Sequence, residues 1–198
     1  MVRVVLSWCW IGLSAVLWGY AFLHLLNKCS GYQKRELDVI CILGMCALTV
    51  YSQWFSLFYK VGLAANVIIL LINVLIIIGF RKKLIQELHT LKNNIRYVMI
   101  FGVVALLIMV LTAQEIGHYD TLLYHAQSIR WIEEYGVVKG LGNLHNRLAY
   151  NSSIFCLEAL FGLKFLFGRS LHTVNGFVVT VLLGYTMCSF KGFKKAKI

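Results

Sequence analysis

The sequence predicts an all-α fold: a polytopic membrane bundle of five or six transmembrane helices, with an amphipathic helix in a large extracytoplasmic loop. Two observations lead to this fold class. Hydrophobic residues make up 60% of the 198 residues and charged residues only 14%, with a mean hydropathy of +0.75, whereas soluble domains carry about 25% charged residues. The apolar residues also form runs of about the 20 residues needed to cross a bilayer.

Five nearly uncharged runs have the length of a membrane span: Val4–Leu26, Val39–Tyr59, Val61–Phe80, Tyr97–Ala113 and Thr173–Phe190. The first is too long for a cleavable signal peptide, so we interpret it as a retained helix. A sixth run, Ile154–Phe167, is shorter and contains Glu158 and Lys164, which are costly in contact with lipid. This run either crosses the membrane, or re-enters it or lies at its interface, and the sequence leaves both alternatives open.

Basic residues predict the orientation. The segments "NKCSGYQKRE" (27–36) and "RKKLIQELHTLKNNIR" (81–96) are separated by two spans, so both lie on one side, which the positive-inside rule makes cytoplasmic. The N-terminus and the loop 114–153 are then extracytoplasmic, and spans two and three form a hairpin around Lys60–Val61. The lysine-rich tail "KGFKKAKI" is cytoplasmic only if Ile154–Phe167 does not cross. The net charge of +11 therefore reflects membrane topology and not nucleic-acid binding.

Two parts are expected within one membrane domain. Residues 1–96 form an N-terminal unit of three spans. Residues 97–198 comprise a span (97–113), an external loop (114–153), a short apolar segment (154–167) and a further span (173–190). The six cysteines are scattered without a C-x-x-C pair, so we expect neither a metal nor a redox site.

The external loop is the one long polar-rich stretch of the chain. Asp120 precedes apolar residues that recur at three- and four-residue steps from Leu122 to Ile132, which predicts an amphipathic helix that ends at Gly136. With Trp131 and tyrosines along it, such a helix lies in the membrane interface. Asp120 either caps the N-terminus of this helix or, at the mouth of a membrane protein, faces a lipid-borne substrate.

A basic, glycine-rich turn follows the helix in "KGLGNLHNRLAYNSS". Gly140 and Gly142 free the backbone to turn tightly and to expose N–H groups, while Lys139, His145 and Arg147 add positive charge. Such a turn suits an anionic group such as phosphate. The alternative is a plain interfacial loop with basic side chains that reach toward the headgroups.

This succession of an outward span, an acidic residue, an interfacial helix and a basic turn resembles the GT-C class of integral-membrane glycosyltransferases. The stretch "YDTLLYHAQSIRWIEEYGVVKGLGNLHNRLAYNSSIFCLEALFG" is similar to the corresponding loop in a group of large, mostly uncharacterised bacterial membrane proteins of that class. The resemblance is specific over about Asp120–Gly162 and elsewhere rests on the layout of spans. Lys139 stands where that group carries proline. Members of the class have more spans, so the resemblance implies that this chain corresponds to their N-terminal part.

The resemblance implies an integral, multi-pass glycosyltransferase of a bacterial cell membrane, or the N-terminal part of one. It would transfer a hexosyl or pentosyl unit from a polyprenyl-phosphate carrier to a cell-surface glycan or lipid acceptor, outside the membrane and with inversion. Asp120 would be the base, beside Glu115, His118 and His125. The substrate and its phosphate would be bound by Lys139, Gly140, Gly142, His145, Arg147 and His125.

No cofactor is implied beyond this lipid-linked donor substrate, and two histidines with one acid do not define a metal site. The expected partners are the lipid bilayer, the donor, the acceptor and further membrane chains, with no nucleic acid. The alternative function is a non-catalytic membrane protein that moves, polymerises or scaffolds lipid-linked glycans. A small transporter or channel ranks last, because Val61–Phe80 and Tyr97–Ala113 contain no charged residue.

Overall fold

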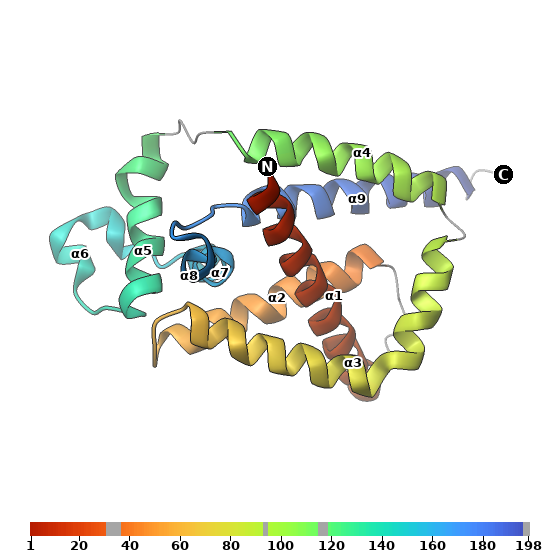
Figure 1. Cartoon of the computed structure of the whole chain (residues 1–198), viewed down its shortest axis with the longest axis horizontal. Helices are drawn as coiled ribbons and strands as arrows, with labels where there is room; N and C mark the ends of the chain where they lie inside the picture. The colour runs from red at the N-terminus through yellow and green to blue at the C-terminus, as the bar shows by residue number, and fades with distance from the viewer. Residues whose placement is uncertain (31–36, 93–94, 115–118, 196–198) are drawn as a thin grey trace.

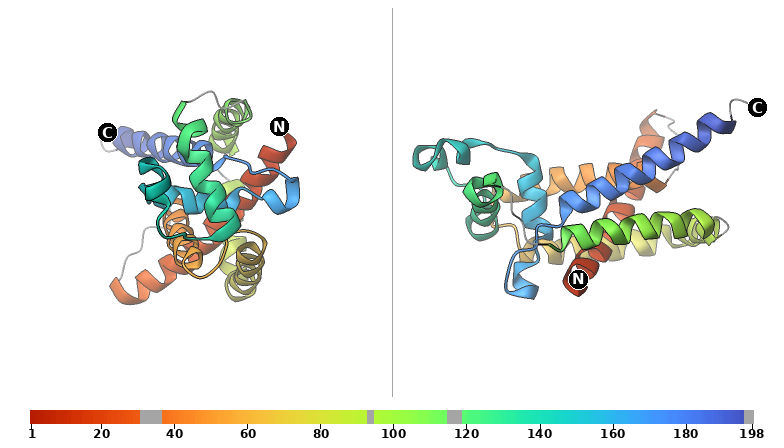
Figure 2. Two further views of the ribbon diagram at one scale, coloured as in Figure 1. Left: turned by 90° about the vertical axis from the view of Figure 1, so that its left-hand side faces the viewer. Right: turned by 90° about the horizontal axis from the view of Figure 1, so that it is seen from above.

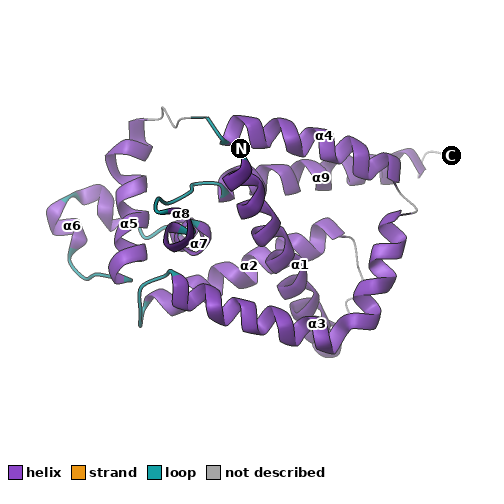
Figure 3. Cartoon of the chain, viewed as in Figure 1, coloured by secondary structure: helices purple, strands orange, loops and turns teal. Residues whose placement is uncertain are grey.

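The computed structural model describes residues 1–30, 37–92, 95–114 and 119–195. Within these ranges the chain forms helices and no strand (Figures 1 and 3), which confirms the all-α prediction. The helices are α1 (Val2–Ser30), α2 (Leu37–Ser56), α3 (Leu63–Lys92), α4 (Ile95–Thr112), η1 (Thr121–His125), α5 (Ala126–Tyr135), α6 (Leu141–Leu144), η2 (Asn146–Ala149), α7 (Ser153–Phe161), α8 (Lys164–Phe167) and α9 (Val174–Lys195).

Three helices in the described part of the chain are long and apolar enough to cross a membrane. They comprise Val2–Lys28, Leu37–Ser56 and Leu63–Lys82, which correspond to the first three predicted spans. Shorter apolar stretches, Phe101–Thr112 and Val174–Thr186, lie in α4 and α9. The structure thus supports a membrane protein, while the full number of spans stays a prediction.

The long helices lie between two ends of the molecule (Figure 1). We call one the loop end, where the turn 57–62 and helices α5 to α8 lie. The other, the tail end, holds the end of α3, the start of α4 and the end of α9, and the right-hand view of Figure 2 keeps this separation. Helix α1 runs obliquely through the bundle and packs against α2, α3 and α9, while α4 lies beside α9. The predicted hairpin of spans two and three is confirmed, with its turn at 57–62.

Helices α1 and α2 cross with their backbones almost in contact. A Cβ atom at Gly19 would overlap the carbonyl oxygen of Ile40, and one at Gly44 would overlap that of Ala15. Small residues at a helix crossing allow this close approach, which maximises van der Waals packing where lipid provides no hydrophobic driving force between helices. The crossing therefore depends on Gly19 and Gly44 having no side chain.

Polar side chains join α1 to α3 at two levels. Trp10 Nε1 donates to Asn66 Oδ1 at 2.9 Å, and Trp18 Nε1 donates to Asn73 Oδ1 at 3.1 Å. Asn73 Nδ2 in turn donates to Ser14 Oγ at 3.1 Å. Both asparagines are buried, and a buried amide is tolerated in apolar surroundings only when it is hydrogen-bonded. These contacts fix the rotation and the height of α1 against α3.

The sixth apolar run, Ile154–Phe167, does not form a helix long enough to span a membrane. Helix α7 has nine residues, about 14 Å at 1.5 Å per residue, against a hydrocarbon core of about 30 Å. It ends where Leu163 adopts the left-handed conformation, with φ of 50°. Nearly all of α7 is buried, against α2 and α5, and α9 then runs back toward the tail end (Figure 1). This geometry favours the alternative in which the segment does not cross.

The two predicted parts of the chain pack together. Helix α2 contacts α7 and α9, and α1 contacts α9, so residues from both sides of the boundary between 96 and 97 share one core. The division at that boundary stays a prediction.

The crossing of α1 and α2 predicts a strong effect of Gly44→Leu. The added side chain forces the backbones apart, so we expect the free energy of unfolding to fall by about 1–3 kcal/mol or more, as for overpacked cores. Unfolding of the purified chain in detergent, followed by circular dichroism, measures this change. Gly79→Leu is the matched control, because a Cβ there meets nothing within 4 Å; equal losses in the two variants would contradict the prediction.

Candidate functional site

The residues of the predicted loop helix are helical and lie at the loop end. Helix η1, a single turn of π-helix, continues directly into α5, so that helical structure runs from Thr121 to Tyr135. It ends at Gly136, as predicted, with φ of 77°. A Cβ atom at Gly136 would crowd the carbonyl oxygens of Ser56 and Tyr59, so glycine is needed both for the turn and for the close approach to the turn 57–62. The predicted location of the helix at a membrane interface stays a prediction.

Asp120 pairs with Arg147 and does not cap the helix. Its backbone is already helical, its side chain makes no capping hydrogen bond, and Arg147 Nη1 donates to its Oδ1 at 2.7 Å. The capping interpretation is therefore wrong. The reason is that an N-cap residue needs a non-helical backbone, whereas Asp120 is already helical, and the fold brings Arg147 within reach across 27 residues of sequence.

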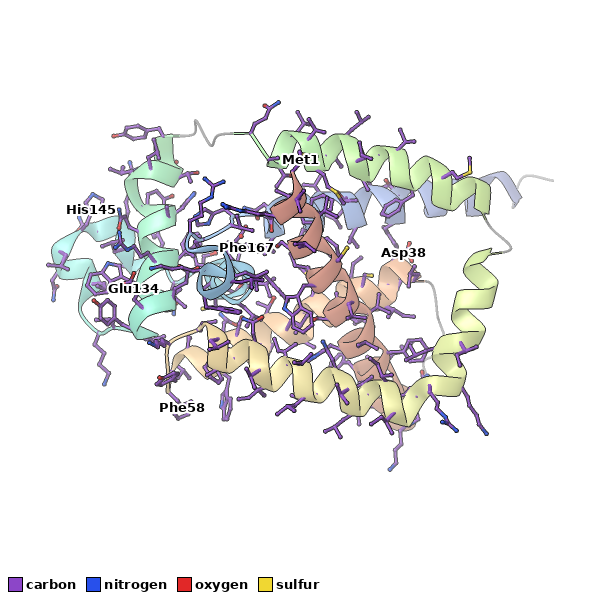
Figure 4. All side chains as sticks on the ribbon, viewed as in Figure 1. Met1, Asp38, Phe58, Glu134, His145 and Phe167 are labelled. Atoms are coloured by element: carbon purple, nitrogen blue, oxygen red, sulfur yellow. The ribbon has the colours of Figure 1, made fainter. Side chains whose placement is uncertain are left out.

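The glycine-rich turn holds Arg147 in place. Gly140, with φ of 85°, begins the short helix α6, and Gly142 leaves room for Ala149. His145 Nδ1 accepts a hydrogen bond from the backbone N–H of Arg147 at 3.2 Å. His145 thus orients the segment that carries Arg147, and it lies at the loop end together with Glu134 (Figure 4).

Aromatic rings line one side of the Asp120–Arg147 pair. The guanidinium of Arg147 lies 5.5 Å from the ring centre of Tyr124, which packs edge-on against Tyr150 at 5.7 Å. His125 packs between Tyr124 at 4.2 Å and Phe155 at 5.2 Å. His125 is therefore part of the aromatic wall that supports Tyr124.

The other predicted site residues are partly placed. The structure brings together Asp120, His145 and Arg147, with His125 behind Tyr124. Lys139 is exposed and, within the described ranges, makes no ion pair. Glu115 and His118 lie outside the described residues. Among the described residues, no three or more His, Cys, Asp and Glu side chains are grouped so as to hold a metal ion.

A second polar centre, which the sequence-based site did not include, lies at the other end of α5. Glu133 is buried and accepts a hydrogen bond from Ser170 Oγ. Glu134 accepts from Lys164 Nζ at 2.5 Å and from Arg130 Nε at 3.2 Å. Burial raises the pKa of Glu133, whereas the hydrogen bonds from Lys164 and Arg130 lower the pKa of Glu134.

One signal in the sequence pointed to Glu133. It follows Ile129 by four residues and therefore falls on the same, buried face of the amphipathic helix. An acidic residue on an apolar face needs a partner, and here the partner is Ser170, which is too distant in sequence to be identified from the pattern.

Glu158 is the most deeply buried carboxyl group of the described chain, with 2% of its surface exposed. It accepts hydrogen bonds from the backbone N–H groups of Val174 at 3.3 Å and Asn175 at 3.2 Å, at the start of α9. Burial raises the pKa of Glu158 to about 7, against the lowering effect of these N–H groups. The structure thus buries Glu158 against other helices, which spares it the cost of contact with lipid.

One comparison with known proteins gives a match. A family model described as a domain of unknown function, DUF8201, matches residues 1–198. The chain belongs to this family. No curated protein and no solved structure matches it. For this DUF8201 chain, a function must therefore be argued from the geometry at the two ends of α5.

The environment of Glu158 predicts a dependence of stability on pH. Because its pKa is raised from 4.5 to about 7 on folding, the folded state binds more protons between these values, and the free energy of unfolding falls as the pH rises through this window. Glu158→Gln stays neutral. Its stability relative to the wild type should therefore increase from pH 4.5 to 7, by up to about 3 kcal/mol at about 1.4 kcal/mol per pKa unit.

Chemical unfolding in detergent at a series of pH values measures this difference for the DUF8201 chain. Glu134→Gln is the contrasting variant: its difference from the wild type should stay constant over the same window, because the pKa of Glu134 is lowered and not raised. If the free energies of unfolding of Glu158→Gln and the wild type changed in parallel with pH, the raised pKa of Glu158 would be contradicted.

Proposed function

We propose that this chain is a membrane glycosyltransferase, or the N-terminal part of one. It transfers a sugar from a polyprenyl-phosphate carrier to a glycan or lipid acceptor on the extracytoplasmic side of a bacterial cell membrane. The observation that carries the proposal is the 2.7 Å contact between Asp120 and Arg147. It places a carboxylate and a guanidinium together at the loop end of an apolar helical bundle. The likeness of this loop to GT-C enzymes supplies the reaction.

In this reaction Asp120 is the base. It accepts the proton of the acceptor hydroxyl while the hydroxyl oxygen attacks the anomeric carbon of the donor sugar. The bond from that carbon to the phosphate oxygen breaks on the opposite face, and polyprenyl phosphate leaves with the electron pair, so the anomeric configuration inverts. A base within hydrogen-bond reach contributes typically 10²–10⁴-fold to such a step.

Arg147 is suited to the phosphate. A guanidinium has five N–H donors in a planar fork, and in the structure Nη1 makes the hydrogen bond to Asp120, which leaves other donor directions for phosphate oxygens. The side chains of Asp120 and Arg147 are 36% and 42% exposed, so a ligand can reach both. Charge that develops on the leaving phosphate is stabilised by Arg147, with His145, Lys139 and the turn at Gly140 and Gly142 nearby in sequence.

The aromatic wall offers a surface for the sugar. Tyr150 is 59% exposed, and together with Tyr124 it forms a ring surface next to the ion pair. A sugar has apolar C–H faces that can lie against such rings while its hydroxyl groups face polar side chains. Tyr124, held from behind by His125, therefore helps to orient the donor sugar.

The topology that accompanies this proposal has five spans. The apolar stretches of α4 and α9 complete a bundle with α1, α2 and α3, α5 lies at the outer interface, and α7 stays on the outer side. The separation of the loop end from the tail end supports this arrangement (Figure 2). The C-terminal end of α1 and residues 81–92 of α3 lie toward the tail end, where the positive-inside rule expects the cytoplasm.

A non-catalytic protein that handles lipid-linked glycans is the second candidate. The same ion pair favours it, because Arg147 neutralises Asp120 as a purely structural pair would. Both candidates need a basic site for lipid phosphate, but only the transferase needs a carboxylate as base.

The proposal predicts that Asp120→Asn abolishes transfer. With the full chain in liposomes that contain a radiolabelled polyprenyl-phosphate hexose, the rate of transfer to a glycolipid acceptor should fall about 10²–10⁴-fold, because the amide cannot accept the proton. Asp38→Asn is the matched control: Asp38 lies away from the loop end (Figure 4) and bonds locally to the N–H of Val39. Wild-type rates in Asp120→Asn would remove Asp120 as the base.

The same preparation separates the two candidates. Arg147→Lys should weaken retention of polyprenyl phosphate, because an ammonium group cannot reproduce the fork of the guanidinium. Retention that survives Asp120→Asn, with no transfer by the wild-type chain, would favour the non-catalytic protein.

A further inference from the structure

A cavity of about 550 Å³ lies where the end of α5, the turn 57–62 and the segment from α7 to α8 meet. Its volume is within the range of ligand pockets, about 300–1,000 Å³. It is separate from the Asp120–Arg147 pair, because Asp120 precedes the continuous helix and Glu133 lies near its other end, roughly 20 Å away at about 1.5 Å per residue. The four charged residues that line it are Lys60, Glu133, Glu134 and Lys164.

The walls of this cavity are tied together by backbone hydrogen bonds. The N–H of Val61 donates to the carbonyl of Ile132 at 3.0 Å, and the N–H of Val137 donates to that of Ser56 at 2.8 Å. These two bonds clamp the end of α5 to the turn between α2 and α3. The site is therefore preformed, so the protein loses less conformational entropy when a ligand binds.

The polar groups of the cavity lining are also held in place by close contacts. Glu133, nine-tenths buried, accepts from Ser170, and Gly162 lies so close that a Cβ there would overlap both side chains. Next to it, Leu163 is buried in the left-handed conformation with φ of 50°. Such strained backbone persists only where the surrounding structure imposes it, and it concentrates at binding sites. Leu163 and Glu133 both line the cavity.

The lining restricts the chemistry of a ligand. Glu133 and Glu134 disfavour a simple anion, Lys60 and Lys164 disfavour a simple cation, and a buried carboxyl group disfavours a purely apolar molecule. The remaining classes are neutral polyhydroxyl compounds and zwitterions. Glu133 already pairs with a hydroxyl group, that of Ser170, and carboxylate oxygens can accept further hydrogen bonds from hydroxyl groups in the same way.

We infer that this cavity binds a carbohydrate unit, held by Glu133, Glu134, Lys60 and Lys164 and remote from the reacting centre. The choice of a carbohydrate over a zwitterion rests on the proposed function. The carboxylates accept from the sugar hydroxyl groups, the ammonium groups donate to them, and the exposed side chains of Leu63 and Phe165 contact the apolar face of the ring. Because the cavity lies far from Asp120, it selects an acceptor glycan of several sugar units.

Saturation-transfer NMR on the full chain in lipid nanodiscs tests this inference. The probes are three neutral oligosaccharides, cellotetraose, mannotetraose and chitotetraose. At least one should bind, and both Lys60→Met and Glu133→Gln should weaken its binding about tenfold or more, since each removes a hydrogen bond to a charged group. Lys60 lies on an exposed turn, so its variant tests the site even if Glu133→Gln fails to fold. Lys28→Met removes the same charge away from the cavity and should bind as the wild type does.

The outcomes separate this inference from the proposed function. Binding should survive Asp120→Asn, which abolishes transfer. If no oligosaccharide binds, or if binding is unaffected by Lys60→Met, the cavity is not a carbohydrate site even where transfer still depends on Asp120. Binding of L-alanine in place of all three oligosaccharides would likewise overturn the assignment.

Discussion

The side chain of Asn66 holds the span bundle to the loop end. Buried in α3, it accepts from Trp10 Nε1 of α1 at 2.9 Å and donates from Nδ2 to the carbonyl oxygens of Gly62 at 3.0 Å and Leu160 at 2.9 Å. An amide in apolar surroundings is stable only if its donors and acceptor are satisfied. One residue therefore sets three relations at once: the height of α1, the start of α3 and the position of α7.

The position of α7 then determines the rest of the loop end. Helix α7 packs on α2 and supports α5. It therefore positions both ends of α5, with Asp120 before the helix and Glu133 near its end. The carboxyl group of Glu158 receives the first N–H groups of α9, which directs α9 back beside α4. A buried acidic residue at a helix N-terminus also complements the positive end of the helix dipole. The sixth apolar run thus serves as a buried support between two polar centres.

Local patterns predicted the parts of this fold that depend on local interactions. Apolar runs located α1, α2 and α3, and three- and four-residue periodicity located the helix that ends at Gly136. The capping alternative for Asp120 was wrong because the residue that pairs with its carboxylate, Arg147, is 27 positions away in sequence. Ser170, the partner of Glu133, is 37 positions away, so the pattern could point to Glu133 but could not identify its partner.

The two polar centres differ in how firmly they are held, and this difference suits different roles. The Asp120–Arg147 pair keeps more than a third of the exposure of both side chains, and exposed ion pairs contribute only about 0–1 kcal/mol. In the proposed transferase, a phosphate group that binds Arg147 can therefore free Asp120 at little cost, as a reacting centre that opens and closes in each cycle requires. Glu133 is clamped by Ser170 and by the close backbone of Gly162. A group so constrained does not rearrange easily, which suits its inferred role of holding a saccharide in one place while the proposed reacting centre acts at a distance.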